Sequence, residues 1–257
     1  MEYNPRTYWT EVADRIQARG SQSLVAGDDT PFYRYKRARF LEEFTKIDFR
    51  DKSVLEVGCG PGGNLEIVHS ATPKRLVGCD ISQKMIDLAT QNLQAVLPSV
   101  ELILTDGVTL PLEDKSMDIT YTVTVLQHNT DEEMLANLVR EICRVTRGKT
   151  FLFEDTSDRI KSGASWTVRP VSYYQTIMEK HGFKLTQVEY ISVLANRLTS
   201  AVILKLMSPG NRKEGEAIPP MAVACQRACL PLTRLLDRIL TERRGLTKML
   251  FEQKTQL

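Results

Sequence analysis

The stretch Val54–Asn64, V-L-E-V-G-C-G-P-G-G-N, decides how the rest of this 257-residue chain is interpreted. Its first four residues predict a strand that is apolar except for one acid, Glu56. Four glycines then fall within six positions, and a helical pattern follows. A strand, a glycine-rich turn and a helix open a nucleotide-binding α/β unit, because glycine permits both the turn and the close approach of a ligand to bare backbone.

Acidic residues follow the next two predicted strands. Arg75–Asp80 ends in Asp80, 22 residues after Gly58, and Val100–Leu104 is followed by Asp106. An acid at the end of the second strand is placed to accept hydrogen bonds from the two hydroxyls of a ribose.

Strands that alternate with helices of ten to fifteen residues predict an α/β fold. We expect a doubly wound, mostly parallel seven-stranded sheet with helices on both faces. Further strands are predicted at Asp118–Leu126 and Lys149–Glu154, and Phe183–Val193 and Ser200–Met207 are expected to add an antiparallel finish. In such sheets ligands bind at the carboxyl ends of the strands.

The pattern divides the chain into three parts. Residues 1–30 are expected to form a helical cap, in which Trp9 either packs or belongs to a lid, and residues 31–207 a Rossmann-like domain. Residues 208–257 are expected to form a basic, amphipathic helical extension, because nine Lys/Arg outnumber five acids from Asn211 onward. That extension packs as a dimer or lid element or lies on an anionic membrane. Contact with nucleic acid is not expected, because basic and aromatic residues do not interleave.

Composition narrows the class of protein further. A content of 42% hydrophobic and 26% charged residues is ordinary for a soluble globular chain, and a net charge of +2 gives no reason to expect nucleic-acid binding. Five scattered cysteines without a C-x-x-C motif predict neither a metal site nor a disulfide framework. With no apolar leader at the N-terminus and no uncharged apolar segment of spanning length, we expect a cytoplasmic protein.

Four motifs together resemble the class I S-adenosylmethionine-dependent methyltransferases over about residues 50–207: L-E-V-G-C-G-P-G-G-N, G-C-D-I-S, T-D-G and D-I-T-Y-T-V-T-V-L-Q-H. The resemblance implies S-adenosylmethionine as cofactor, bordered by the glycine loop at its methionine part and held by Asp80 at its ribose. It also implies that Ile81 and Met85 line the adenine pocket, that Asp106 meets the adenine amino group, and that Gly107 lets its loop pass close to the ring. The full set of predicted cofactor-binding residues is Tyr33, Glu56, Gly58, Cys59, Gly60, Gly62, Asn64, Asp80, Ile81, Met85, Asp106, Gly107, Val123 and Gln127.

The acid Glu56 favours this donor over a dinucleotide. The sulfonium cofactor is cationic and carries an ammonium group, whereas the pyrophosphate of NAD prefers a helix N-terminus without a neighbouring acid. An NAD-dependent oxidoreductase and a non-catalytic methyltransferase-fold partner subunit are the alternative functions.

Methyl transfer to oxygen or nitrogen needs positioning and, for some acceptors, a base. His128, at the end of the fourth predicted strand, is either a base or substrate-orienting group or else a cofactor or structural contact. Glu154 and Asp155 at the end of the fifth strand are further catalytic candidates, with a plain strand-end cap as the alternative. We expect methyl transfer to an oxygen or nitrogen, less readily a carbon, of a small-molecule acceptor whose identity the motifs leave open.

Overall fold

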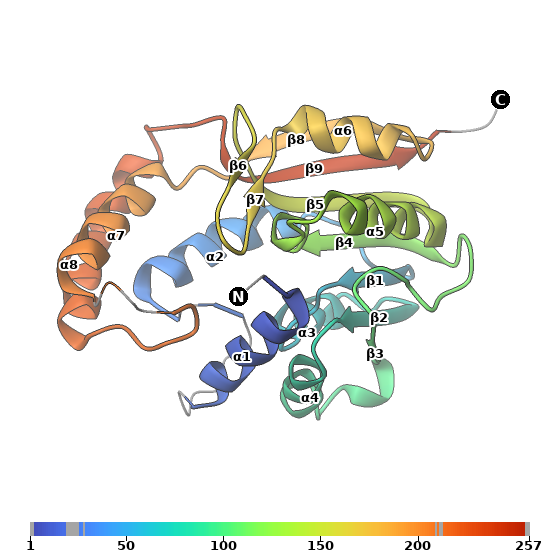
Figure 1. The fold of residues 1–257 in the computed structure, drawn as a ribbon, viewed down its shortest axis with the longest axis horizontal. Helices are drawn as coiled ribbons and strands as arrows, with labels where there is room; N and C mark the ends of the chain where they lie inside the picture. Colours follow the sequence, from blue (N-terminus) through green and yellow to red (C-terminus); the bar gives the residue numbers. More distant parts are fainter. Residues whose placement is uncertain (1–2, 19–25, 28, 209, 211–212, 255–257) are drawn as a thin grey trace.

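A seven-stranded sheet runs through the centre of the molecule (Figure 1). The computed structural model describes residues 3–18, 26–27, 29–208, 210 and 213–254. The sheet order is β3-β2-β1-β4-β5-β9-β8; β9 is antiparallel to β5 and β8, and the other pairs are parallel, which confirms the predicted fold class. The strands are β1 (Ser53–Val57), β2 (Arg75–Asp80), β3 (Glu101–Leu104), β4 (Met117–Val123), β5 (Thr146–Thr156), β8 (Phe183–Tyr190) and β9 (Gly245–Gln253).

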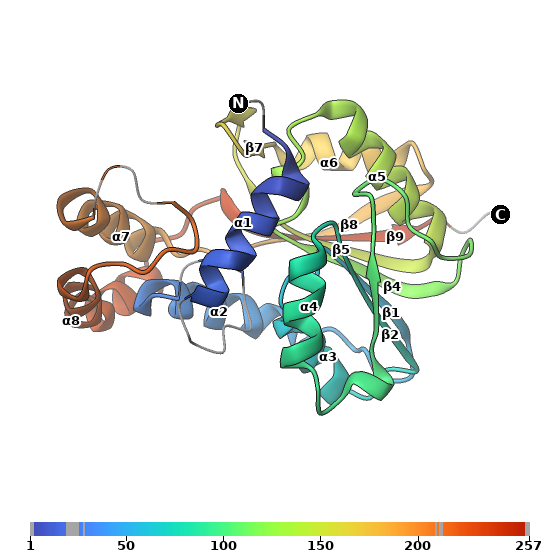
Figure 2. The ribbon, with the colours of Figure 1, turned by 60° about the horizontal axis from the view of Figure 1, so that its bottom comes forward.

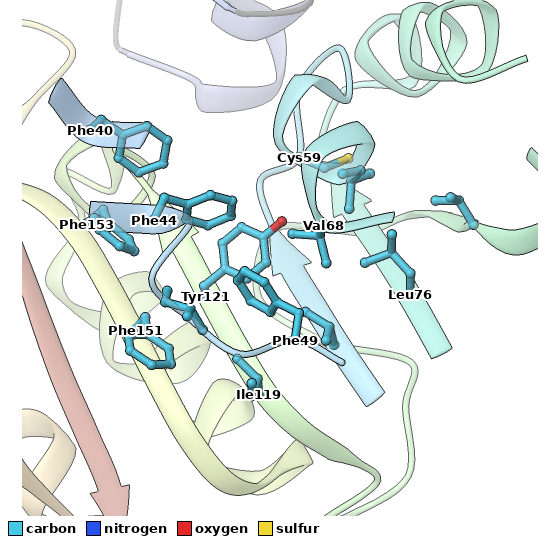
Figure 3. Close-up of a cluster of buried hydrophobic side chains, with 14 of the residues drawn as sticks. Phe40, Phe44, Phe49, Cys59, Val68, Leu76, Ile119, Tyr121, Phe151 and Phe153 are labelled. Carbon is cyan, nitrogen blue, oxygen red and sulfur yellow. The ribbon is translucent and has the colours of Figure 1, made fainter. Parts of the chain in front are cut away.

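Helices cover both faces of the sheet, because successive side chains of a strand point to opposite sides. In β1, Val54 joins the apolar cluster under α2, α3 and α4, whereas Leu55 joins the cluster under α5 and α6. Figure 3 shows the first cluster, where Phe44 lies against Tyr121 with ring centroids 5.1 Å apart. These helices are α2 (Pro31–Phe44), α3 (Gly63–Ser70), α4 (Gln83–Asn92), α5 (Glu132–Val145) and α6 (Val171–Glu179).

The N-terminal helix α1 (Pro5–Ala18) lies beside α4 in both ribbon views (Figures 1 and 2). Val12 and Ile16 pack with Met85 of α4 in a small buried cluster. The Tyr8 hydroxyl donates to Glu214 Oε2 at 2.6 Å, which ties α1 to the segment before α8. Residues 19–25 and 28 of the predicted cap lie outside the described part of the chain.

Two predictions for the end of the chain are wrong. Ser200–Met207 is not a strand but the last part of α7 (Leu194–Met207), and the antiparallel strand that completes the sheet is β9, within the tail predicted to be helical. The tail therefore supplies an inner strand of the sheet, and α7 and α8 (Pro220–Asp237) form a helical pair inserted between β8 and β9. The helical start of α7 depends on a distant residue, because the backbone amides of Ala195 and Asn196 donate to Asp237 at 2.7 and 3.3 Å.

The fourth strand is also shorter than predicted. It ends at Val123, Thr124 adopts a left-handed φ of 55°, and a 3-10 turn, η2 (Leu126–His128), follows. The fully buried guanidinium of Arg169 donates to Asn129 O at 2.9 Å and to Glu132 Oε1 at 2.6 Å. These bonds fix a small hairpin, β6 (Lys161–Ser162) and β7 (Thr167–Val168), beside the turn.

Among the described helices, none combines the length and the apolar character needed to cross a bilayer.

Candidate cofactor and active site

A cavity lies at the carboxyl ends of β1 to β4, where the sequence places the ligand. The structure brings eight of the predicted residues together in its wall, namely Gly58, Gly60, Asp80, Ile81, Met85, Gly107, Val123 and His128.

The glycine loop forms one side of this cavity. The amides of Gly58 and Cys59 both donate to Cys79 O, at 2.8 and 2.9 Å, which holds the loop against the end of β2. Gly58 has φ +74°, and a Cβ there would lie 2.4 Å from Val125 Cγ2. Gly62, also left-handed at φ +90°, caps α3 and is not among the cavity-lining residues. Glycine is therefore required at position 58 both by backbone angle and by space.

Asp80 presents a buried carboxylate at the cavity wall. Gly60 N donates to its Oδ2 and Ser82 N to its Oδ1, each at 2.9 Å. Burial raises the pKa of Asp80, while these backbone amides act to lower it. The two amides fix the orientation of the carboxylate, and its remaining lone pairs can accept bonds from a ligand's hydroxyls.

Glu56 lies beneath the glycine loop rather than in the cavity wall. Its oxygens accept from Asn64 Nδ2 at 2.8 Å and from the Tyr121 hydroxyl at 3.0 Å, so it joins β1 to α3 and β4. Complete burial raises the pKa of Glu56 to about 8. Cys59 is likewise buried under the loop, and burial raises the pKa of its thiol. The predicted contacts of Glu56, Asn64 and Cys59 with the cofactor would thus be made through the loop.

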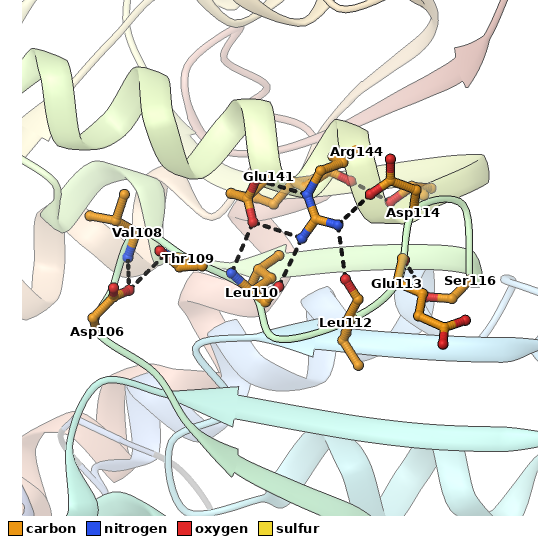
Figure 4. Close-up of polar contacts among 12 residues, drawn as sticks. Asp106, Val108, Thr109, Leu110, Leu112, Glu113, Asp114, Ser116, Glu141 and Arg144 are labelled. Carbon is orange, nitrogen blue, oxygen red and sulfur yellow. Dashed lines mark hydrogen bonds and ion pairs between the residues drawn. The ribbon is translucent and has the colours of Figure 1, made fainter.

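Asp106 is turned toward its own loop (Figure 4). Its Oδ1 accepts from Val108 N at 2.8 Å and Thr109 N at 2.6 Å, and these bonds lower the pKa of the carboxyl. Further along the loop, Arg144 donates to Leu110 O and Leu112 O, both at 2.8 Å. The loop that carries Gly107 is therefore anchored on α5, while Asp106 lines a neighbouring hollow.

His128 lies in the cavity wall with its protonation site defined by its partners. Its Nδ1 is 2.9 Å from Ser165 O, and because a carbonyl oxygen only accepts, Nδ1 carries the proton. Gln127 Oε1 accepts from Asp155 N at 3.0 Å, which leaves the Gln127 amide nitrogen 3.4 Å from His128 Nε2. Nε2 is thus the unprotonated nitrogen, and its lone pair accepts a hydrogen bond from the Gln127 amide nitrogen. Trp9 packs edge-on against the imidazole, with ring centroids 4.9 Å apart.

The other predicted residues lie outside the cavity wall. Glu154 is fully buried and accepts from Thr122 Oγ1 and from the amides of residues 125, 126 and 127, so it supports the turn that carries His128. Burial raises the pKa of Glu154 to about 7. Asp155 pairs with Lys36 at 3.7 Å in the wall of a second cavity, which Tyr33 also lines. The Tyr33 hydroxyl donates to Ala26 O, and Ala26 in turn lines the cofactor cavity.

Several lining residues were not predicted. Ala26 and Pro5 come from the N-terminal segment, and Thr124 and Val125 from the turn after β4. No signal in the sequence marks that turn, because its residues continue the β-branched pattern of the strand. Asn129, which also lines the cavity, directly follows His128 and could have been found as a polar residue at a strand end.

The charge and shape of the cavity fit S-adenosylmethionine. Among the described lining residues there is one carboxylate, Asp80, and no lysine or arginine, which suits a cation better than a pyrophosphate. A Cβ at Gly107 would meet Ile81 Cδ1 at 2.6 Å, so the backbone there leaves room that a side chain would fill.

Comparison with known proteins identifies the same fold and cofactor class. A family model described as a methyltransferase domain matches residues 54–149. An "uncharacterized 37.1 kDa protein" of a Streptomyces fradiae transposon is 40% identical over 95 residues, 36% of this chain and 27% of the relative. A "Probable S-adenosylmethionine-dependent methyltransferase" of Mycobacterium tuberculosis is 30% identical over 132 residues, 51% of this chain and 45% of the relative. The chain thus spans less than half the length of these relatives.

The structure of magnesium protoporphyrin IX methyltransferase from Synechocystis, with bound S-adenosylhomocysteine, superposes with a TM-score of 0.61. It is 13% identical, and the match covers 97% of this chain and 98% of the other, so it speaks for the fold alone. With the family match over residues 54–149, these findings confirm the predicted resemblance to the class I S-adenosylmethionine-dependent methyltransferases, and with it the predicted fold, enzyme class and cofactor.

Proposed function

We propose that this S-adenosylmethionine-dependent methyltransferase transfers a methyl group to an oxygen or nitrogen atom, less readily to carbon, of a small-molecule acceptor. The observation that carries the proposal is the position of His128. His128 lines the cofactor cavity, its Nδ1 is engaged by Ser165 O, and its unprotonated Nε2 accepts only from the Gln127 side-chain amide among the described residues. A base so placed is useful for an acceptor that must lose a proton and superfluous for one that does not.

Bound S-adenosylmethionine would supply a methyl group on a positively charged sulfur. Asp80 would hold its ribose, and Ile81 and Met85 would flank its adenine. His128 Nε2 would exchange its hydrogen bond from the Gln127 amide for the proton of the acceptor's O–H or N–H group, while the Ser165 carbonyl holds the ring in place. Trp9 lines the wall beside His128, where its ring would shield the reacting atoms from water.

A second cavity supports an acceptor with a sizeable apolar body. It lies between α2, α7, the end of β5 and the start of β9. Phe32, Trp166 and Leu204 contribute apolar surface, and Lys36 and Asp155 add charge. Trp166, which lines this second cavity, follows Ser165, whose carbonyl is the partner of His128 in the first cavity. We place the acceptor in this second cavity, with its reacting atom toward His128.

The remaining parts of the proposal concern setting and partners. We expect a cytoplasmic enzyme, consistent with five free thiols, of which Cys59, Cys79 and Cys143 are buried in the fold. A small molecule rather than a nucleic acid is the expected acceptor. Within the basic C-terminal part, residues 208–257, we expect contact with a membrane or a second copy of the chain through its helix, α8.

The test is a methyl-transfer assay with isotopically labelled S-adenosylmethionine and pools of small hydroxyl and amine compounds. With an acceptor found, His128→Gln should lower kcat about 100-fold or more and change cofactor affinity little, the usual range for a lost general base. His181→Gln, the same change at an exposed histidine after α6, is the matched control and should retain full activity. Transfer by His128→Gln at the unaltered rate would show that His128 is only a contact.

A further inference from the structure

The helical pair α7–α8 carries most of the apolar surface that the described chain exposes. The pair projects from one end of the molecule, away from the sheet (Figures 1 and 2). It packs on itself and on α2. Of thirteen large hydrophobic side chains that are exposed among the described residues, nine lie on or directly after these two helices. Such a concentration in one supersecondary unit indicates an interaction surface.

The exposed side chains follow the helical repeat. On α7, Leu198, Val202 and Leu206 recur every four residues and are 54%, 57% and 76% exposed. On α8 and the turn after it, Leu232, Leu235 and Ile239 recur at intervals of three and four, with exposures of 61%, 55% and 72%. Each helix therefore presents a continuous aliphatic stripe, which we call the α7 stripe and the α8 stripe.

The exposed charges of the two helices are all of one sign, although one of them, Arg197, pairs with Glu242 after the turn at 2.7 Å. Exposed cations lie on both helices and in the turn that follows α8: Arg197, Lys205, Arg227, Arg234 and Arg238. The one acid in the sequence of the two helices is Asp237, which is 4% exposed and accepts from the amides that open α7. The accessible charge of the two helices is thus cationic.

We propose that the α7 and α8 stripes dock the protein on the surface of an anionic lipid bilayer. Aliphatic side chains would enter the headgroup region, and the neighbouring lysine and arginines would meet anionic headgroups. At 14 and 18 residues, α7 and α8 lie on the surface of the bilayer rather than cross it.

The charge pattern favours lipid over the other occupants. A symmetric contact between two copies would place the same cationic surface against itself, which like-charge repulsion opposes. A nucleic acid would match the cations, but it would leave the aliphatic stripes in water, and neither helix contains a phenylalanine, tyrosine or tryptophan on which a base could stack.

The docking surface adjoins the second cavity. Arg197, Ala201 and Leu204 of α7 line that cavity, so α7 separates the cavity from the α7 stripe. If the proposed function holds, an apolar acceptor dissolved in the bilayer would have a short route to the enzyme. The docking itself does not depend on that function.

The experiment is co-sedimentation of the purified full chain with two kinds of vesicle, phosphatidylcholine alone and phosphatidylcholine with about one-third phosphatidylglycerol. We expect preferential binding to the anionic vesicles, weakened as sodium chloride is raised from about 0.05 to about 0.5 M. The double variant Leu206→Ser/Ile239→Ser should bind about tenfold or more weakly. Arg227→Gln should reduce binding to anionic vesicles about fivefold, the value for one basic residue at such a surface.

Leu104→Ser is the control, since Leu104 is 43% exposed on β3, away from α7–α8, and should leave vesicle binding unchanged. Titration with S-adenosylmethionine reports separately whether each variant keeps its fold, so failure of methyl transfer and failure of docking are distinguishable. The proposal is overturned if anionic vesicles do not bind or if the double variant binds as well as the wild type. It is equally overturned if the chain sediments as a dimer that the double variant dissociates, because the stripes then cover a second copy.

Discussion

Replacing Gly58 by alanine should damage both folding and cofactor binding. Gly58 has φ +74°, and the new Cβ would lie 2.4 Å from Val125 Cγ2 and 3.0 Å from its Cγ1. A side chain in the left-handed region costs about 1–2 kcal/mol, and overpacking a filled site adds about 1–3 kcal/mol. We therefore expect the free energy of unfolding to fall by about 2–5 kcal/mol, a large part of the roughly 5–15 kcal/mol of a typical domain.

Urea denaturation of the ligand-free protein measures this loss, and titration with S-adenosylmethionine measures the effect on binding. Gly182→Ala is the matched control: Gly182 has φ +80° but open space around its Cα, so only the backbone cost should appear. Adding Val125→Ala to Gly58→Ala should recover about 1–3 kcal/mol relative to additive effects, because the overlap is removed. Equal losses in Gly58→Ala and Gly182→Ala, or strict additivity with Val125→Ala, would refute the steric argument.

Two further predictions concern the buried carboxylates beneath the site. Glu56 has a pKa of about 8 in the fold against 4.5 when unfolded, so the folded state binds the extra proton and the stability of the ligand-free protein should fall as pH rises through this window. Between pH 7 and 8, above the pKa of about 7 for Glu154, the titration of Glu56 should lower the free energy of unfolding by about 1 kcal/mol. A series of urea titrations at different pH should show this fall in the wild type and not in Glu56→Gln. If Glu56→Gln keeps the full dependence of stability on pH, the burial argument is contradicted. Glu154→Gln places an amide nitrogen near backbone donors, so it should lower the free energy of unfolding by about 1–3 kcal/mol in the same denaturation assay. It should also weaken cofactor binding, because Glu154 supports the turn that carries His128. Unchanged stability would mean that other contacts hold the turn.

The sheet and the centre of the site could be predicted because their signals are local. The apolar pattern of β1, the glycines after it and Asp80 at the end of β2 lie within 27 residues, counting from Val54 to Asp80. Each of these three features depends only on the residues of a short segment: a buried strand, a turn with unusual backbone angles, and an acid at a strand end.

The end of the chain could not be predicted, because distant partners decide it. Lys248 is a charged residue in an inner strand and is only 5% exposed. Its burial is tolerated because its Nζ is 3.1 Å from Glu189 and 3.5 Å from Glu43. A lysine in an apolar run suggests a half-exposed helix when these partners are unknown. The apolar run of α7 fits a strand as well as a helix, and Asp237, which caps the helix, lies far along the chain.

The placement of Glu154 and Tyr33 has a similar origin. Both stand at the ends of elements that approach the site, but the side chain of Glu154 accepts four hydrogen bonds beneath the turn. Tyr33 is directed to Ala26 O. The positions of Glu154 and Tyr33 in the sequence correctly place both residues near the carboxyl ends of the strands. They do not show whether each side chain faces the cofactor cavity or packs beneath it.

Calorimetric titration with S-adenosylmethionine, S-adenosylhomocysteine and NAD, on the wild type and on Asp80→Asn, tests the central claim most directly. We predict that the first two ligands bind the wild type, and that Asp80→Asn weakens both about 10- to 100-fold, the loss of one or two hydrogen bonds to a charged group. NAD should show no comparable binding, because the described lining has no lysine or arginine to pair with a pyrophosphate and the acid Glu56 lies beneath the glycine loop where that group would bind. Binding of NAD in preference to S-adenosylmethionine, or equal cofactor affinity in Asp80→Asn and the wild type, would contradict the assignment of this cavity.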